Sequence, residues 1–158
     1  MSDRQPMTVS GKAKLESELK ALITVERPNV IRAIEEARGH GDISENADYD
    51  AAKDRQAMIE GRIAEIQGKI ANSEVVDVSS LKSNTIIFGA HVELMDEETE
   101  EKVTYQIVGE DEADVKGGKI SVFSPIARSL IGKKKGDIIE FKSPKGEKEF
   151  EVLNFFFR

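Results

Sequence analysis

The stretch that decides the fold runs from Val30 to Ile70 and reads VIRAIEEARGHGDISENADYDAAKDRQAMIEGRIAEIQGKI. In its second part, apolar residues recur largely at alternating spacings of four and three, as Ala52, Ile59, Ile63, Ile66 and Ile70. This spacing is typical of the seam of a coiled coil, and the charged residues between these positions suit exposed faces. Because each helix alone would expose its apolar stripe, we predict that two helices pair with each other.

A short break in the apolar pattern determines how the two helices are arranged. The tripeptide 39–41, Gly-His-Gly, interrupts the pattern, and Asp42 restarts it. A break this short permits only an antiparallel hairpin. The first helix extends back to about Thr8, and Pro28 inside it should kink or divide it, because proline has no N–H to donate. At ~1.5 Å per residue, an arm of about thirty residues reaches roughly 45 Å.

From about Val75 the apolar period changes from helical to alternating, which is typical of β-strands. Turn-forming glycine, proline and aspartate residues separate the runs. One short helix interrupts them at residues 124–131, where Ser124 suits the N-cap and Pro125 the first helical position. The runs that we predict as strands are EVVDV, NTIIF, AHVELM, KVTYQIV, KISVF, DIIEFK and EKEFEVLNFFF.

The predicted fold class is therefore α+β. An N-terminal antiparallel coiled-coil helical hairpin occupies residues 1–76, and a C-terminal antiparallel β-sheet domain with one short helix occupies residues 77–158.

Composition narrows the functional classes. The 158 residues carry a net charge of -7 and include no cysteine, which excludes disulfides and thiolate metal sites. Broad binding to duplex DNA needs clustered lysine and arginine, so the acidic balance argues against it. No apolar run approaches the ~20 residues that cross a bilayer, and the start MSDRQPMTVSG lacks a signal-peptide pattern. We expect a cytoplasmic protein with no membrane contact.

Two carboxylates, Asp42 and Glu45, lie at the turn of the predicted hairpin. One explanation is structural: they form an acidic relative of the capping box that starts a helix, favoured by the helix dipole. The other is chemical, because two carboxylates one turn apart on the leading edge of an arm can reach one cation. They are too few to hold Mg²⁺ tightly alone. A partner would have to complete the site, as in two-metal phosphoryl transfer.

Five segments carry a resemblance to a known family. They are RPNVIRAIEEAR, GDISENADYDAAK, EGRIAEIQGKIANSEVVD, IVGEDEAD and SVFSPIARSLIGKKKGD. In order and spacing they closely resemble the Gre transcript-cleavage factors, nearest to the GreA type. The resemblance runs through nearly the whole chain, and its most specific parts are the hairpin tip and the SPIAR segment.

The resemblance implies a transcription elongation factor that binds bacterial RNA polymerase. Its coiled coil would enter the secondary channel and stimulate the polymerase's own cleavage of the nascent RNA 3′ end in backtracked or arrested complexes, so that elongation resumes. Asp42 and Glu45 would help to hold the second catalytic Mg²⁺, shared with the polymerase active site, and orient water. The protein alone would bind no cofactor and cleave no RNA, and we expect it to act as a monomer.

The resemblance also implies an FKBP-like C-terminal domain that docks on the rim of the channel. Ser124, Pro125 and Ile126 match the docking segment, although a strand end and a helix cap could account for Ser124 entirely. On the arm, Arg38, Lys53 and Arg55 are candidates for contact with extruded RNA, since local cations can act despite a negative total. An ordinary charged coiled-coil exterior is the alternative explanation for these three.

Three other functions are alternatives to this one. The resemblance implies that a paralogue that enters the same channel but inhibits the polymerase would carry an altered, more acidic tip. The spacing of Asp42 and Glu45 instead matches the cleavage-active pattern of the family. A peptidyl-prolyl isomerase would need an aromatic-lined pocket, and the C-terminal half has no tryptophan. A coiled-coil adaptor would have no chemistry at the tip.

Overall fold

The computed structural model describes residues 4–39 and 46–158. The chain forms two compact units: one is Lys12–Ser73, and in the other the first eleven residues join Glu74–Arg158. The division into residues 1–76 and 77–158 stays a prediction. The predicted tip acids lie outside the described residues.

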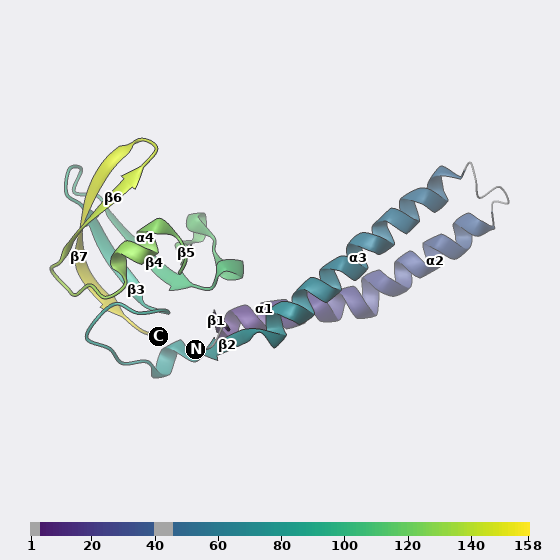
Figure 1. The fold of residues 1–158 in the computed structure, drawn as a ribbon, viewed down its shortest axis with the longest axis horizontal. Coiled ribbons are helices and arrows are strands. Elements are labelled where there is room, and N and C mark those ends of the chain that lie inside the picture. The colour runs from purple at the N-terminus through teal and green to yellow at the C-terminus, as the bar shows by residue number, and fades with distance from the viewer. Residues whose placement is uncertain (1–3, 40–45) are drawn as a thin grey trace. The chain divides into compact units, whose positions relative to one another are not determined.

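Three α-helices build the hairpin: α1 (Val9–Ala21), α2 (Arg27–Arg38) and α3 (Ala47–Ala71). Helices α2 and α3 run antiparallel and side by side (Figure 1), which confirms the predicted hairpin. Their seam buries the residues that the heptad spacing selects. The buried cluster contains Val30, Ile59 and Ile63, with Leu19, Leu22 and Ile23 packed against it.

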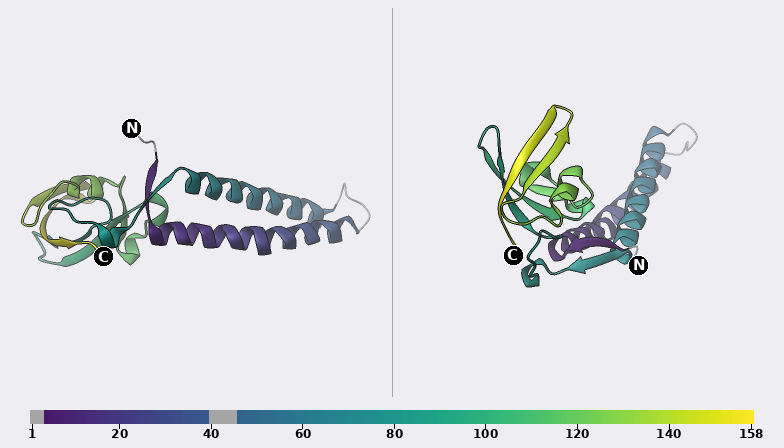
Figure 2. Two further views of the ribbon diagram at one scale, coloured as in Figure 1. Left: turned by 90° about the horizontal axis from the view of Figure 1, so that it is seen from below. Right: turned by 60° about the vertical axis from the view of Figure 1, so that its left-hand side comes forward.

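Pro28 divides the first helix, as predicted. A π-helical turn, η1 (Leu22–Glu26), lies between α1 and α2, and in it the N–H of Arg27 donates to the carbonyl of Leu22. Because Pro28 has no N–H for the carbonyl of Thr24 and its ring crowds that carbonyl, the wider turn accommodates it. The rod stays continuous: Figure 2 shows α1, η1 and α2 as one run of helix beside α3.

A five-stranded sheet forms the other unit, in the order β5-β4-β3-β7-β6. Its strands are β3 (His91–Asp96), β4 (Lys102–Val108), β5 (Lys119–Ser121), β6 (Ile138–Ser143) and β7 (Gly146–Phe156). The pairs β3–β4, β3–β7 and β6–β7 are antiparallel, as predicted.

One strand pair departs from the predicted antiparallel sheet. β4 and β5 are parallel, with Ile107 opposite Ile120. The cause is the connection between them, which folds into two 3-10 turns, η3 (Glu110–Glu112) and η4 (Val115–Gly117), and returns the chain before β5 begins. The sheet is therefore mixed, within the predicted α+β class.

A second sheet has two strands, β1 (Gln5–Thr8) and β2 (Ser73–Val76). The prediction of a strand at EVVDV matches β2, whereas the pattern of the first residues did not predict β1.

The predicted strand NTIIF was wrong. Its central residue, Ile86, is fully buried. Its N–H donates to the carbonyl of Lys133 at 2.9 Å, and its carbonyl accepts from the N–H of Gly132 at 2.8 Å. One residue thus pairs with a loop, and the apolar run reflects burial in the core instead of a strand ladder.

The predicted short helix is α4 (Pro125–Leu130). Its buried residues Ala127 and Leu130 pack against the sheet, where the fully buried side chains include Val92, Leu94, Ile107 and Val152. Across residues 4–39 and 46–158, no helix is both long enough and apolar enough to cross a membrane.

Candidate functional site at the end of the hairpin

Two helix ends meet at the turn of the hairpin (Figure 1). Helix α2 ends at Arg38, and α3 begins at Ala47 after its N-cap, Asn46. The predicted catalytic and metal-binding residues Asp42 and Glu45 belong to the segment between these ends, outside the described residues. Their roles stay predictions. The part of the site that the structure describes consists of the end of α2 and the start of α3.

Asn46 starts α3, whereas the sequence pattern placed the restart at Asp42. Its backbone is extended (φ -91°, ψ 98°), and its side-chain oxygen accepts a hydrogen bond from the N–H of Tyr49 at 3.1 Å. This bond satisfies one of the N–H groups that the first turn of a helix leaves unpaired. Asparagine is among the best N-cap residues, so its place before ADYD is a signal for this helix start that the break in the apolar pattern does not reveal.

The other half of the Asn46 amide reaches across the hairpin. Its nitrogen donates to the backbone carbonyl of Ala37, in the last turn of α2. Both residues are buried, with 8% of Asn46 and 2% of Ala37 exposed. A single side chain therefore closes the base of the segment that contains the two tip acids.

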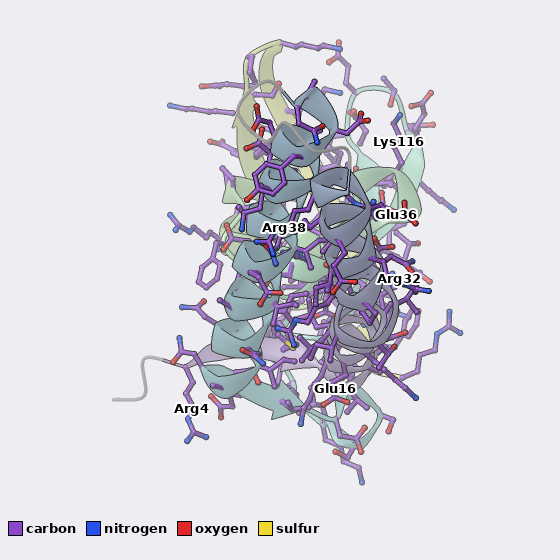
Figure 3. All side chains as sticks on the ribbon, turned by 90° about the vertical axis from the view of Figure 1, so that its right-hand side faces the viewer. Arg4, Glu16, Arg32, Glu36, Arg38 and Lys116 are labelled. Carbon is purple, nitrogen blue, oxygen red and sulfur yellow. The ribbon has the colours of Figure 1, made fainter. Side chains whose placement is uncertain are left out.

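Charges at the two helix ends have the signs that the helix dipoles favour. Asp48 and Asp50 lie in the first turn of α3, and both are exposed, as predicted. Arg38 lies in the last turn of α2, also exposed (Figure 3). Acids at a helix start and bases at a helix end interact favourably with the partial charges there. These groups therefore stabilise the helix ends whatever else they contact.

The other two candidates for RNA contact, Lys53 and Arg55, both contact neighbouring side chains. Arg55 forms an ion pair with Glu26 at 2.8 Å, and the Lys53 ammonium donates to the side-chain oxygen of Gln56 at 3.1 Å. These contacts fit the charged exterior of a coiled coil. They leave the RNA-contact role of Arg38, Lys53 and Arg55 a prediction.

Arg62 contacts two acidic side chains. It pairs with Glu18 on α1 and, at 3.3 Å, with Glu65 on its own helix. The hydrogen bond from Arg62 lowers the pKa of the Glu18 carboxyl below its ordinary value, against the opposing effect of desolvation. An exterior ion pair is therefore its structural role.

The three docking candidates start α4. The Ser124 hydroxyl accepts from the N–H of Ala127 at 3.3 Å and donates to the carbonyl of Ser121 at 2.7 Å. Pro125 is exposed, and Ile126 is half-buried against the core. The Ser124 hydroxyl thus accepts one bond as a helix cap and donates one to the end of β5, and the docking role of all three residues stays a prediction.

A shallow cleft of about 430 Å³ lies beside the same helix. It includes two exposed isoleucines, Ile131 and Ile138, with 39% and 57% exposed. Cations and an anion share its lining with them, namely Arg128, Lys133 and Glu140. These residues could not be predicted as a group from the sequence, because they come from segments that only the fold brings together.

A metal site was predicted only at the tip. Within the described part of the chain, histidine, aspartate and glutamate residues form no group of three or more that could hold a metal ion. Two carboxylates are hard oxygen donors that suit Mg²⁺ but leave most of its six positions to other ligands.

Family models match both parts of the chain. The model described as "Transcription elongation factor, N-terminal" matches residues 5–75, and "Transcription elongation factor, GreA/GreB, C-term" matches residues 81–155.

Curated relatives are similar over almost their whole length. The transcription elongation factor GreA of Maricaulis maris is 56% identical over 149 residues, covering 94% of this chain and 95% of the relative. That of Phenylobacterium zucineum is 58% identical over 150 residues, covering 95% and 96%. Among solved structures, the GreA factor homolog 1 protein of Thermus thermophilus is 27% identical with a TM-score of 0.44, covering 96% of this chain and 98% of that one. On the two family models and these curated relatives, the chain belongs to the GreA/GreB family of transcription elongation factors.

Proposed function

We propose that this elongation factor binds bacterial RNA polymerase and stimulates cleavage of the nascent RNA 3′ end in backtracked or arrested complexes. The observation that carries the proposal is the hairpin, whose turn contains two carboxylates. Helix α3 has 25 residues, which correspond to roughly 37 Å at ~1.5 Å per residue. An arm of that length suits insertion into the secondary channel, with docking through Ser124, Pro125 and Ile126.

Asp42 and Glu45 would bring carboxylate oxygens to the polymerase active site. There they would help to bind the second catalytic Mg²⁺, with the polymerase supplying its remaining ligands, and would orient the attacking water by accepting hydrogen bonds from it. Mg²⁺ in such a site supplies charge stabilisation for phosphodiester hydrolysis. On this proposal the chain alone binds no cofactor, cleaves no RNA and acts as a monomer in the cytoplasm.

RNA contact is proposed mainly for Arg38 and Lys53. Arg38 is exposed beside the turn, and the ammonium of Lys53 donates to the neutral amide of Gln56. Arg55 is already neutralised by Glu26, so its contact with RNA would require exchange of that partner.

Transcript cleavage in a stalled elongation complex tests the proposal. The double change Asp42→Asn, Glu45→Gln keeps side-chain size and removes both charges. We expect it to retain polymerase binding and to lower stimulated cleavage by on the order of 100-fold or more, a loss typical of removing a group that stabilises a transition state. The matched control is Asp48→Asn, Asp50→Asn, which removes two exposed acids from the first turn of α3 and should leave cleavage unchanged.

Three outcomes would contradict the proposal. Cleavage at the wild-type rate in the first double variant would exclude the tip mechanism. Inhibition of the polymerase by the wild-type protein would favour an inhibitory paralogue, and rapid turnover of a prolyl peptide would favour an isomerase. Family membership favours neither of these alternatives.

A further inference from the structure

The amide of Asn46 makes two different hydrogen bonds at the base of the tip segment. Its oxygen accepts from the N–H of Tyr49 in α3, and its nitrogen donates to the carbonyl of Ala37 in α2. The bond to Ala37 is buried, so it is shielded from water and gains strength from the low local dielectric. Asn46 therefore joins the first turn of one helix to the last turn of the other.

An amide suits this position better than any other short polar side chain. A carboxylate could accept from Tyr49 but could not donate to Ala37, because ionised aspartate has only acceptors. A serine hydroxyl could cap the helix about as well as asparagine, but its oxygen lies one bond closer to the backbone. It would not reach across to the other helix. The cap alone thus permits several residue types, whereas the bridge selects asparagine.

The bridge lies next to the proposed site in the chain. Ala37 and Asn46 are separated by nine positions, and the segment between them contains both tip acids, with Glu45 bonded directly to Asn46. Fixing both ends of a short segment reduces the number of conformations that it can adopt. Fewer conformations mean that less ordering is needed when the two carboxylates act together on one ion.

We propose that Asn46 is a positioning residue for transcript cleavage: its bridge fixes the end of α2 to the start of α3, the two helix ends between which Asp42 and Glu45 lie in the sequence. This inference rests on the proposed function. Asn46 acts through the backbone of the tip and not by touching the reacting atoms. Its role compares with that of outer residues that orient metal ligands, whose loss lowers activity about 10–100-fold.

The decisive variant is Asn46→Ser, which keeps the helix cap and removes the bridge. Its matched control is Arg62→Gln, which weakens another bond between the two sides of the hairpin, the contact of Arg62 with Glu18, many turns from the tip. Circular dichroism and urea unfolding first establish that both variants keep the wild-type helix content under the assay conditions.

Cleavage is then measured in a stalled elongation complex as a function of factor and Mg²⁺ concentration. For Asn46→Ser we expect the maximal cleavage rate to fall about 10–100-fold, the half-maximal factor concentration to stay within about two-fold, and the half-maximal Mg²⁺ concentration to rise. Amide hydrogen exchange in the last turn of α2 and the first turn of α3 of the free protein should become faster. Arg62→Gln should change none of these four quantities.

Two results would overturn the inference. A wild-type maximal rate and Mg²⁺ dependence in Asn46→Ser would show that the tip does not need the bridge. Equal losses in Asn46→Ser and Arg62→Gln would show that Asn46 contributes only general hairpin stability. The Asp42→Asn, Glu45→Gln variant separates the two proposals: if it abolishes cleavage while Asn46→Ser does not, the bridge inference alone fails. If it retains cleavage, the tip mechanism fails.

Discussion

The carboxylate of Glu112 accepts hydrogen bonds from both the backbone N–H and the hydroxyl of Thr8, the former at 3.0 Å, across 104 positions of sequence. It also accepts from the N–H of Gly109 at 3.1 Å, and the Thr8 hydroxyl accepts from the N–H of Gly11 at 3.0 Å. All four residues belong to the unit that combines the first eleven residues with Glu74–Arg158. One carboxylate thus fixes the start of α1 against η3.

Replacing Glu112 with glutamine should destabilise this unit. The glutamine amide keeps the shape but presents N–H groups where two N–H donors and a hydroxyl converge, so at least one donor loses its acceptor. Thr8 is buried, and a buried donor without a partner typically costs about 1–3 kcal/mol. Urea unfolding would measure the loss, with the exposed neighbour Glu110→Gln as the control. A free energy of unfolding equal to that of the control would contradict this role for Glu112.

Gly11 should respond to alanine in opposite ways in two backgrounds. A Cβ at Gly11 would overlap with Cδ of Glu112, so Gly11→Ala must displace the carboxylate and weaken its bonds to Thr8. In a Glu112→Ala background the clash is absent, and the helix preference of alanine over glycine should stabilise α1 by roughly 0.5–1 kcal/mol. A double-mutant cycle by urea unfolding measures this change of sign. Additive effects of the two substitutions would contradict a contact between these residues.

The hairpin and the α+β class could be predicted from sequence because their signals are local. Ile59, Ile63 and Ile66 repeat within one helix, and the burial of all three confirms the seam. Pro28 likewise acts within its own helix, because it has no N–H to donate to the carbonyl of Thr24. The acidic tip could be located in the same way, as a break in a periodic pattern, although its chemistry stays a prediction.

The features that the sequence did not predict depend on contacts between distant residues. Glu112 sits in the acidic run EDEAD, and nothing nearby indicates that its partner is Thr8. Ile86 pairs with a loop that follows another helix, so its apolar neighbours resembled a strand. Asn46 bridges to Ala37 only because the hairpin has already formed, which is why its capping signal was visible in the sequence and its bridge was not.

Ile66 is the most informative position for testing the seam of the hairpin. It is completely buried on α3, so Ile66→Ala removes methyl and methylene groups from a packed interface and leaves a cavity. Such substitutions cost about 2–5 kcal/mol. On the same helix, Met58 is 75% exposed, and Met58→Ala should change stability by less than about 0.5 kcal/mol. Helix unfolding followed by circular dichroism compares the two, and similar midpoints would contradict the predicted packing.

His91 makes the stability of the sheet unit depend on pH. Its ring stacks on that of Phe156, with centroids 5.1 Å apart and planes within 5°, and the guanidinium carbon of Arg158 lies 5.0 Å from the Phe156 centroid. Desolvation lowers the pKa of His91 below its ordinary value, the positive charges of Arg158 and Lys119 lower it further, and a backbone hydrogen bond at Arg158 opposes the shift. The folded state therefore favours the neutral ring.

The sign of the pH effect follows from this lowered pKa. Above the ordinary histidine pKa of about 6.5, the ring is neutral in both states and contributes no pH dependence. As the pH falls through that value, the unfolded chain binds a proton before the folded one does, so the free energy of unfolding decreases until the folded ring is also protonated. Between pH 7.5 and pH 5, wild type should lose more stability than His91→Gln, which retains no titrating ring. Urea unfolding at several pH values measures both losses, and equal losses would show that the stacked ring has no lowered pKa.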